Sequence, residues 1–144
     1  MNKREETNKI IIHCSATKPS MNTDAAEIDR WHRERGWLKI GYHFVIKRDG
    51  TIEEGRHVDE VGAHAKGHNS TSVSVCMIGG VAEDNVQEAE NNFMDSQWTS
   101  LESVVDTLVN KYPDADVIGH NDISDKECPS FNVGEWYAEY RARA

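Results

Sequence analysis

The residues Lys9-Ile10-Ile11-Ile12-His13 form an apolar run that ends in a histidine. Such a run is typical of a strand that is buried on both faces of a sheet. A second histidine, His120, follows the shorter apolar pair Val117-Ile118 in the same way. Sites in open α/β sheets form at the carboxyl ends of strands, so parallel neighbouring strands would bring His13 and His120 together. The run therefore predicts a sheet edge at which a functional site can form.

Helical and strand patterns alternate along the rest of the chain. Asp24 and Glu27 have the spacing of a helix capping box, and Gly36 is expected to end that helix. Asp49-Gly50 separates two apolar runs, which predicts a hairpin. The expected strands are 9–13, 43–47, 51–54, 73–78 and 117–118, and the expected helices are 24–35, 97–112 and one after Asn132. This order predicts a single α/β domain over residues 1–144, a central mixed β-sheet flanked by helices.

The segment from Val81 to Asp95 is strongly acidic and contains no basic residue. A charge run of this kind is usually exposed to solvent, so we expect a solvated loop here. Residues 62–70, rich in glycine, histidine, asparagine and serine, are also expected to form a loop.

The composition is that of an ordinary globular chain. Its 144 residues are 38% apolar and 28% charged, enough for one domain with a real core. The formal net charge of −9 disfavours nucleic-acid binding, which needs a basic face. Three cysteines without framework spacing argue for a reducing compartment. No apolar run reaches the ~20 residues that span a bilayer, and residues 1–8 lack the apolar region of a signal peptide.

His13, His120 and Cys128 together form a candidate zinc site of two imidazoles and one thiolate. Structural zinc sites have four protein ligands, whereas three ligands leave the fourth tetrahedral position open for catalysis. Lys126, two residues before the cysteine, is spaced to reach the open side of the metal. The pattern predicts one Zn²⁺ per chain and a hydrolytic reaction. Cys14 and Cys76 are expected in the core and not at the metal.

Three motifs occur in a distinctive order along the chain. They are His13-Cys14-Ser15-Ala16-Thr17-Lys18-Pro19, Gly41-Tyr42-His43-Phe44 and Cys128-Pro129-Ser130-Phe131. From about residue 9 to residue 136 the chain resembles the zinc-dependent N-acetylmuramoyl-L-alanine amidases of bacteriophage, which are related to the animal peptidoglycan-recognition proteins. The resemblance implies a mixed β-sheet flanked by helices, one zinc ion, and hydrolysis of the amide between N-acetylmuramic acid and L-alanine in peptidoglycan.

The resemblance also implies roles for individual residues. The implied zinc ligands are His13, His120 and Cys128, and the implied catalytic residues are Tyr42 and Lys126. Tyr42 would hold the attacking water and relay its proton, and Lys126 would stabilise the developing oxyanion. The loop His64-Ala65-Lys66-Gly67-His68-Asn69 resembles the substrate-contacting loop of the family, with His64 and Asn69 as the expected contacts.

Other residues have alternative interpretations. His43 either orients a zinc ligand or is a core histidine with satisfied hydrogen bonds. His32 and His57 are predicted at the surface, and Trp37 could line a groove. Trp31, Trp98 and Trp136 lie on predicted helix faces and are expected in the core.

The most favoured function is that of a monomeric phage endolysin, made in the host cytoplasm and reaching the wall through a separate membrane pore. One alternative is a peptidoglycan-binding module that does not cleave, although non-cleaving relatives lack the cysteine ligand. Another is an amidase that also contacts and inhibits a phage RNA polymerase. A zinc nucleobase deaminase would need His-x-Glu and Pro-Cys-x-x-Cys motifs, and neither occurs.

Overall fold

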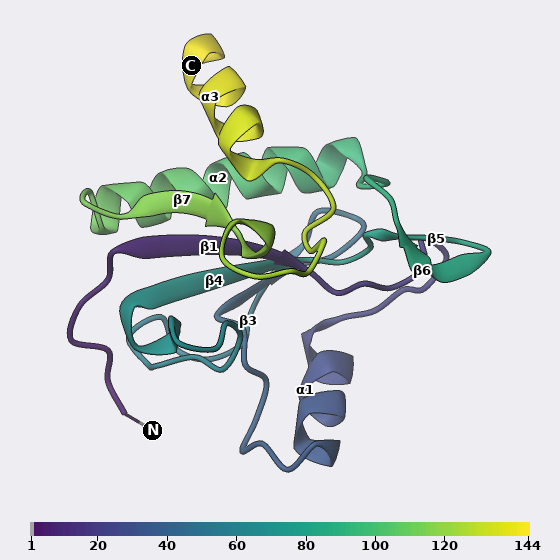
Figure 1. Cartoon of the computed structure of the whole chain (residues 1–144), viewed down its shortest axis with the longest axis horizontal. Helices are drawn as coiled ribbons and strands as arrows, with labels where there is room; N and C mark the ends of the chain where they lie inside the picture. The colour runs from purple at the N-terminus through teal and green to yellow at the C-terminus, as the bar shows by residue number, and fades with distance from the viewer. Residues whose placement is uncertain (1) are drawn as a thin grey trace.

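The centre of the fold is a sheet of five strands in the order β3-β2-β4-β1-β7 (Figure 1). The computed structural model describes residues 2–144. The strands of this sheet are β1 (Lys9–Cys14), β2 (Phe44–Ile46), β3 (Ile52–Glu54), β4 (Ser72–Met77) and β7 (Asp116–Gly119). Neighbouring strands are parallel, except that β3 runs antiparallel to β2. The predicted mixed sheet is confirmed, and the apolar run of β1 lies at its interior, between β4 and β7.

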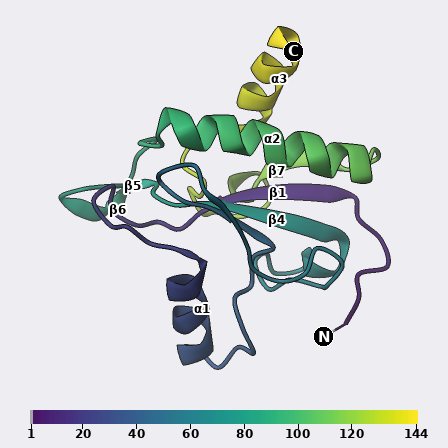
Figure 2. The same cartoon turned by 180° about the vertical axis from the view of Figure 1, so that it is seen from behind.

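Two helices cover opposite faces of the sheet (Figures 1 and 2). α2 (Asp95–Lys111) contributes Leu101, Val105 and Leu108 to one core cluster, together with Ile10 and Ile12 of β1. Successive side chains of a strand point to opposite faces. Since Ile12 faces α2, the side chain of the next residue, His13, points to the other face of the sheet.

That other face is covered by α1 (Ala25–Glu34), which packs Ile28 into a smaller cluster with Val45 and Cys76. The Asp24 side chain accepts a hydrogen bond from the Glu27 backbone N–H at 2.9 Å and so caps α1, as predicted. The helix ends before Gly36, also as predicted. The third helix, α3 (Val133–Arg143), contacts β7 and projects away from the sheet on the α2 side (Figure 1).

The prediction of a loop over residues 81–95 is wrong. Val81–Ala82 (β5) and Asn85–Ala89 (β6) pair as a two-stranded antiparallel hairpin, and α2 already begins at Asp95. Val81 and Ala82 are buried, at 6% and 4% exposure. The Asn92 side chain fixes the base of the hairpin by bonding the Gly80 N–H and the Val81 carbonyl. The acidic composition indicated exposed side chains correctly, but it says nothing about the pairing of the backbone.

Two short 3₁₀ turns complete the architecture, η1 (Asn69–Thr71) before β4 and η2 (His120–Asp122) directly after β7. Within the described residues, no helix has the length and apolar character needed to cross a membrane.

Candidate functional site

The three predicted zinc ligands meet at the carboxyl end of the sheet. β1 and β7 are parallel neighbours in which Ile12 is paired with Gly119, so His13 and His120 leave the two strands side by side. Their ring centroids are 4.5 Å apart. Cys128 reaches the same place from the segment after η2, and its Sγ lies 3.9 Å from Nδ1 of His13. The ligand atoms of all three residues lie within 4.8 Å of one another.

A chain of hydrogen bonds determines which nitrogen of His13 faces this cluster. The Ser72 hydroxyl donates to the His68 carbonyl at 2.7 Å, so its oxygen is free to accept from Nε2 of His64 at 3.2 Å. Nδ1 of His64 then accepts from Nε2 of His13 at 2.9 Å. In this arrangement the proton of the His13 ring is on Nε2, and the lone pair of Nδ1 points towards Cys128.

Both ligand histidines are held in the neutral form, which is the form that binds metals. Burial lowers the pKa of His13 well below its usual value, and His64, His120 and Lys126 lower it further. Burial also lowers the pKa of His120, with a contribution from the Lys126 ammonium.

The segment between η2 and α3 is braced so that Cys128 and Lys126 face the site. The Asn121 side chain donates to the Phe131 carbonyl at 3.2 Å and ties the two ends of the segment together. At the sulfur, the neighbouring Cys14 thiol and burial raise the pKa of Cys128 well above its usual value. The Cys14 backbone N–H, which donates to Cys128 Sγ at 3.0 Å, acts in the opposite direction and lowers that pKa. Cys14 itself is buried, as predicted, and is outside the ligand cluster.

Tyr42 lies beside the ligand cluster, its ring centroid 5.1 Å from that of His13 and 5.6 Å from that of His32. Burial raises the pKa of Tyr42 well above its usual value, and the neighbouring thiols Cys76, Cys128 and Cys14 raise it further. The phenol therefore stays protonated and can donate a hydrogen bond.

His32 is not at the surface, so that prediction is wrong. It is 6% exposed, and its Nδ1 accepts a hydrogen bond from the Gly41 N–H at 2.9 Å. Burial lowers its pKa to about 4. The buried residues of α1 are Ala25, Ile28 and His32, a spacing of three and four that places them on one helix face. That spacing is the sequence signal that could have located His32.

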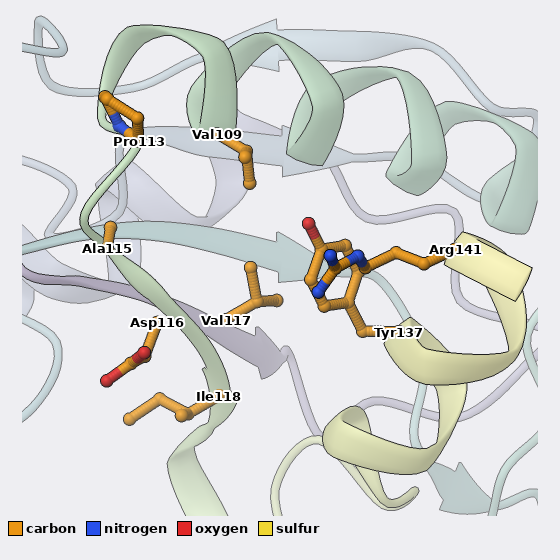
Figure 3. Close-up of a pocket in the computed structure, with 8 residues that line it drawn as sticks. All are labelled: Val109, Pro113, Ala115, Asp116, Val117, Ile118, Tyr137 and Arg141. Atoms are coloured by element: carbon orange, nitrogen blue, oxygen red, sulfur yellow. The ribbon is translucent and has the colours of Figure 1, made fainter. Parts of the chain in front are cut away.

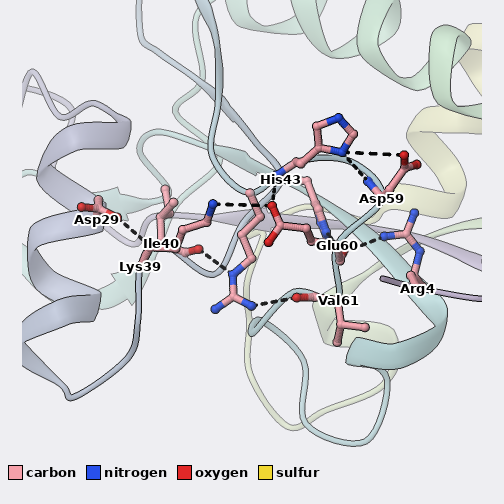
Figure 4. Close-up of polar contacts among 10 residues, drawn as sticks. Arg4, Asp29, Lys39, Ile40, His43, Asp59, Glu60 and Val61 are labelled. Carbon is pink, nitrogen blue, oxygen red and sulfur yellow. Dashed lines mark hydrogen bonds and ion pairs between the residues drawn. The ribbon is translucent and has the colours of Figure 1, made fainter. Parts of the chain in front are cut away.

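His43 is a core histidine with both ring nitrogens satisfied, which decides between the two interpretations. Its Nε2 donates to the Glu60 carbonyl at 2.7 Å (Figure 4). Its Nδ1 accepts from the Ser74 N–H at 3.0 Å. Close by, the buried Arg56 donates to the carbonyls of Ile40 at 2.8 Å and Val61 at 2.7 Å. Through these two bonds Arg56 links the segment at Ile40, just before Tyr42, to the segment at Val61, just before His64. No pattern in the sequence singled out Arg56.

A groove of about 560 Å³ opens over the ligand cluster. Tyr42, His64 and Asn69 line it together with the three ligands, and so do Trp37 and Lys126. The Asn69 side-chain oxygen accepts from the backbone N–H groups of His64 and Ala65, both at 2.9 Å, and so shapes the loop that forms one wall. The structure therefore brings every predicted site residue to one groove, although the ring nitrogens of His64 bond to protein groups.

A second hollow lies between the end of α2, the edge strand β7 and α3 (Figure 3). It is lined by Val109, Pro113, Ala115, Asp116, Val117, Ile118, Tyr137 and Arg141. Neither histidine nor cysteine is among these described residues, so the hollow has no counterpart of the His13, His120 and Cys128 cluster in the groove.

Comparison with known proteins agrees with this geometry. The family model described as N-acetylmuramoyl-L-alanine amidase matches residues 3–131. The endolysin of Escherichia phage T7 is 48% identical over 134 residues, covering 93% of this chain and 87% of the endolysin. The N-acetylmuramoyl-L-alanine amidase endolysin LysCS from Clostridium intestinale has a similar structure, with a TM-score of 0.81 and 32% sequence identity. The similarity covers 98% of this chain and 91% of the LysCS chain. Wild-type Drosophila PGRP-LB gives a TM-score of 0.76 at 27% identity, covering 96% of this chain and 82% of that one.

Proposed function

The chain belongs to the N-acetylmuramoyl-L-alanine amidase family and is a peptidoglycan amidase, and from this premise we propose that His13, His120 and Cys128 hold the one zinc ion at which it acts. The observation that carries the proposal is the convergence of these three donors, from three separate segments, on the floor of one groove. The bond cleaved is the amide between N-acetylmuramic acid and L-alanine.

The donor set fits zinc. Ligand atoms of a tetrahedral zinc site lie roughly 3.3–3.6 Å apart, since Zn–N bonds are ~2.0–2.1 Å and Zn–S bonds ~2.3 Å. The 3.9 Å between Cys128 Sγ and His13 Nδ1 needs only a small side-chain adjustment to reach such a separation. The His13 ring is also oriented by His64, as outer hydrogen-bond partners commonly orient metal-ligating histidines. Two imidazoles and a thiolate are ligands typical of zinc.

Bound zinc would supply a Lewis acid for the amide carbonyl and lower the pKa of water. The remaining roles belong to side chains in the groove. Tyr42, kept protonated by its surroundings, donates a hydrogen bond to the reacting oxygen and passes a proton on. The Lys126 ammonium, which lines the same groove, stabilises the negative charge that develops on the substrate oxygen.

His64 and Asn69 act on the substrate mainly through the loop that they shape. Asn69 holds the backbone of His64 and Ala65, so this wall of the groove is set before substrate arrives. His64 keeps His13 in the tautomer that a metal needs. A direct contact of either side chain with substrate remains a prediction.

We place this activity in an endolysin, because phage endolysins such as that of T7 are similar along almost the whole chain. In that role the protein is made in the host cytoplasm and acts on the cell wall after release through a separate pore. The presence of Cys128 beside the two histidines favours cleavage over binding alone.

Digestion of purified peptidoglycan tests the proposal. The wild-type protein should release new L-alanine amino termini and no new reducing sugar ends. New reducing ends would instead indicate glycoside hydrolysis by paired carboxylates. Tight wall binding without new amino termini would identify a non-cleaving binding module.

A further inference from the structure

Tyr42 lies outside every described helix and strand, so bonds from other segments must determine where its side chain points. The Ile40 N–H donates to the Asp29 carboxylate at 2.8 Å (Figure 4). The Gly41 N–H donates to Nδ1 of His32 at 2.9 Å. These two bonds tie the residues before Tyr42 to α1, but they fix only the N–H side of the chain.

Arg56 fixes the carbonyl side of the same residues. Its Nε donates to the Ile40 carbonyl at 2.8 Å, and its backbone N–H donates to the Tyr42 carbonyl at 2.9 Å. A second nitrogen of its guanidinium donates to the Val61 carbonyl at 2.7 Å. Arg56 therefore holds the chain on both sides of Gly41 and ties it to the segment at Val61.

The segments that Arg56 joins are also in direct backbone contact. The Ala63 N–H donates to the Gly41 carbonyl at 3.1 Å, and a Cβ added to Gly41 would lie only 1.9 Å from the Ala63 oxygen. A Cβ added to Gly55 would lie 2.2 Å from the Tyr42 oxygen. Only glycine permits such close approaches of two backbones. A displacement of one segment is therefore passed on to the chain at Tyr42.

The contacts of Arg56 depend on the shape of a guanidinium. The side chain is a buried cation, 8% exposed, and none of the ion pairs among the described residues includes it. Its partners are carbonyls, which form charge-assisted hydrogen bonds with it. A planar guanidinium holds its donors in fixed directions, whereas a lysine ammonium is a point charge on a flexible stem. Two carbonyls from two segments are thus held in a fixed relation by an arginine.

The charge of Arg56 also supports the bond from Gly41 to His32. Nδ1 of His32 can accept that bond only while it carries no proton. Burial is the main reason that the pKa of His32 is lowered to about 4; Arg35, which lines the groove, and Arg56 lower it further, and Asp29 opposes them. Arg56 therefore helps to fix the Gly41 N–H through its charge as well.

We propose that Arg56 is a positioning residue that sets the place of the Tyr42 hydroxyl beside the ligand cluster, and that turnover depends on Arg56 through Tyr42. The proposal rests on the catalytic role of Tyr42 proposed above. Arg56 is not among the described residues that line the groove, so it acts without touching substrate. A catalytic group works only within hydrogen-bond reach of the reacting atom, and a misplacement of ~1 Å can lower the rate by about 10²-fold.

The test is a double-mutant cycle of Arg56→Lys and Tyr42→Phe, with turnover measured on a soluble synthetic muramyl peptide. Arg56→Lys should lower kcat by about tenfold or more with little change in KM, because it misplaces the hydroxyl and removes no contact with substrate. In Tyr42→Phe protein, which has no hydroxyl to misplace, the same substitution should lower kcat by less than about twofold. Zinc content should match that of wild type in every variant.

Hydrogen exchange gives a readout that does not depend on activity. In Arg56→Lys the Ala63 amide, which bonds to the Gly41 carbonyl, should exchange faster than in wild type. Arg48→Lys is the matched control, because Arg48 also donates to a backbone carbonyl, that of Ile78 at 3.3 Å, and is not among the described residues that line the groove. It should leave both kcat and the exchange at Ala63 unchanged.

Arg56→Gln is the second variant, for use if Arg56→Lys does not fold. It removes the charge and keeps an amide donor for one carbonyl, and its loss of kcat should likewise vanish in Tyr42→Phe protein. Equal losses with and without the Tyr42 hydroxyl would overturn the proposal and indicate a general structural role. A loss that vanishes in His64→Ala protein but persists in Tyr42→Phe protein would also overturn it, since Arg56 would then act through the other segment.

Failure of the proposed function would look different. Wild-type turnover by Tyr42→Phe would remove the catalytic role of Tyr42 and the proposal for Arg56 with it. If wild-type protein cleaves neither the peptide nor purified peptidoglycan, the amidase function fails. An unchanged exchange rate at Ala63 in Arg56→Lys would overturn the bracing by Arg56 whatever the activity.

Discussion

Nε2 of His13 lies 2.9 Å from Nδ1 of His64, and this contact joins residues that are 51 positions apart in the sequence. It leaves Nδ1 of His13 as the nitrogen that faces Cys128. We expect His64→Ala to weaken zinc binding by about 10- to 100-fold, because outer partners of metal-ligating histidines contribute on that scale. Competition with a chelator measures this affinity. His57→Ala, which removes an exposed histidine, should leave it unchanged, and an equal loss in both variants would rule out the positioning role.

Replacing Cys128 with alanine should remove most of the bound zinc. The ligands come from β1, η2 and the segment before α3, so a metal that joins them also stabilises the fold. Elemental analysis should give one zinc per chain for wild type, and addition of a chelator should lower its Tm. Cys76→Ala, a change in the core outside the cluster, should keep the zinc. Full retention of zinc by Cys128→Ala would contradict the ligand assignment.

Tyr42→Phe and Lys126→Ala should each lower turnover by about 10²-fold or more while keeping the zinc and the fold. Each change removes one positioned donor or proton relay, and effects of this size are typical of such losses. Turnover on peptidoglycan, measured together with zinc content, separates this effect from metal loss. The controls are Tyr137→Phe, beside β7, and Lys111→Ala, on the surface. A variant of Tyr42 or Lys126 with near wild-type turnover would show that the residue is a bystander.

His43 should make stability depend on pH in the acid range. Burial is the main reason that its pKa is lowered to about 4; Arg4 and Arg56 contribute, and Glu60 opposes them. An unfolded histidine has a pKa of about 6.5, so between pH 6.5 and 4 the unfolded chain binds a proton that the folded one does not. The contribution of His43 is fully present above pH 6.5 and is lost as the pH falls towards 4.

The expected loss is about 3 kcal/mol over this interval, from about 1.4 kcal/mol for each unit of pKa. Urea unfolding at several pH values measures it. His43→Gln should be less stable at pH 7 and show a shallower slope of unfolding free energy with pH. His57→Gln should keep the wild-type slope; if His43→Gln keeps it as well, the dependence comes from other groups.

Gly36→Ala should lower the free energy of unfolding by about 1 kcal/mol. No atom lies within 4 Å of the added Cβ, so the cost comes from the positive φ of +91° and not from a clash. Gly134→Ala is the matched comparison, because Gly134 lies inside α3 and its added Cβ makes only an ordinary contact of 3.5 Å with Asn132. That substitution should stabilise the protein by about 0.5–1 kcal/mol. Chemical denaturation of both variants checks the opposite signs.

Much of the fold was predictable because its elements depend on residues close together in the chain. The isoleucines of β1, the Asp24 cap, and the Asp49-Gly50 turn act through local backbone preference and side-chain period. The burial of His32 and the pairing of β5 with β6 were missed. In both cases the surrounding polar residues indicated exposure, while packing and backbone pairing decided the structure.

The sequence by itself determined the kinds of groups available for the site and indicated two of their positions, since His13 and His120 each follow an apolar run that predicts a strand. Only the tertiary structure decided what each group faces. The bond from His13 to His64, the place of Arg35 in the groove, and the core position of His43 join segments brought together by parallel strands and loop packing. Such contacts depend on register and burial across the whole domain, and no local pattern of residues encodes them.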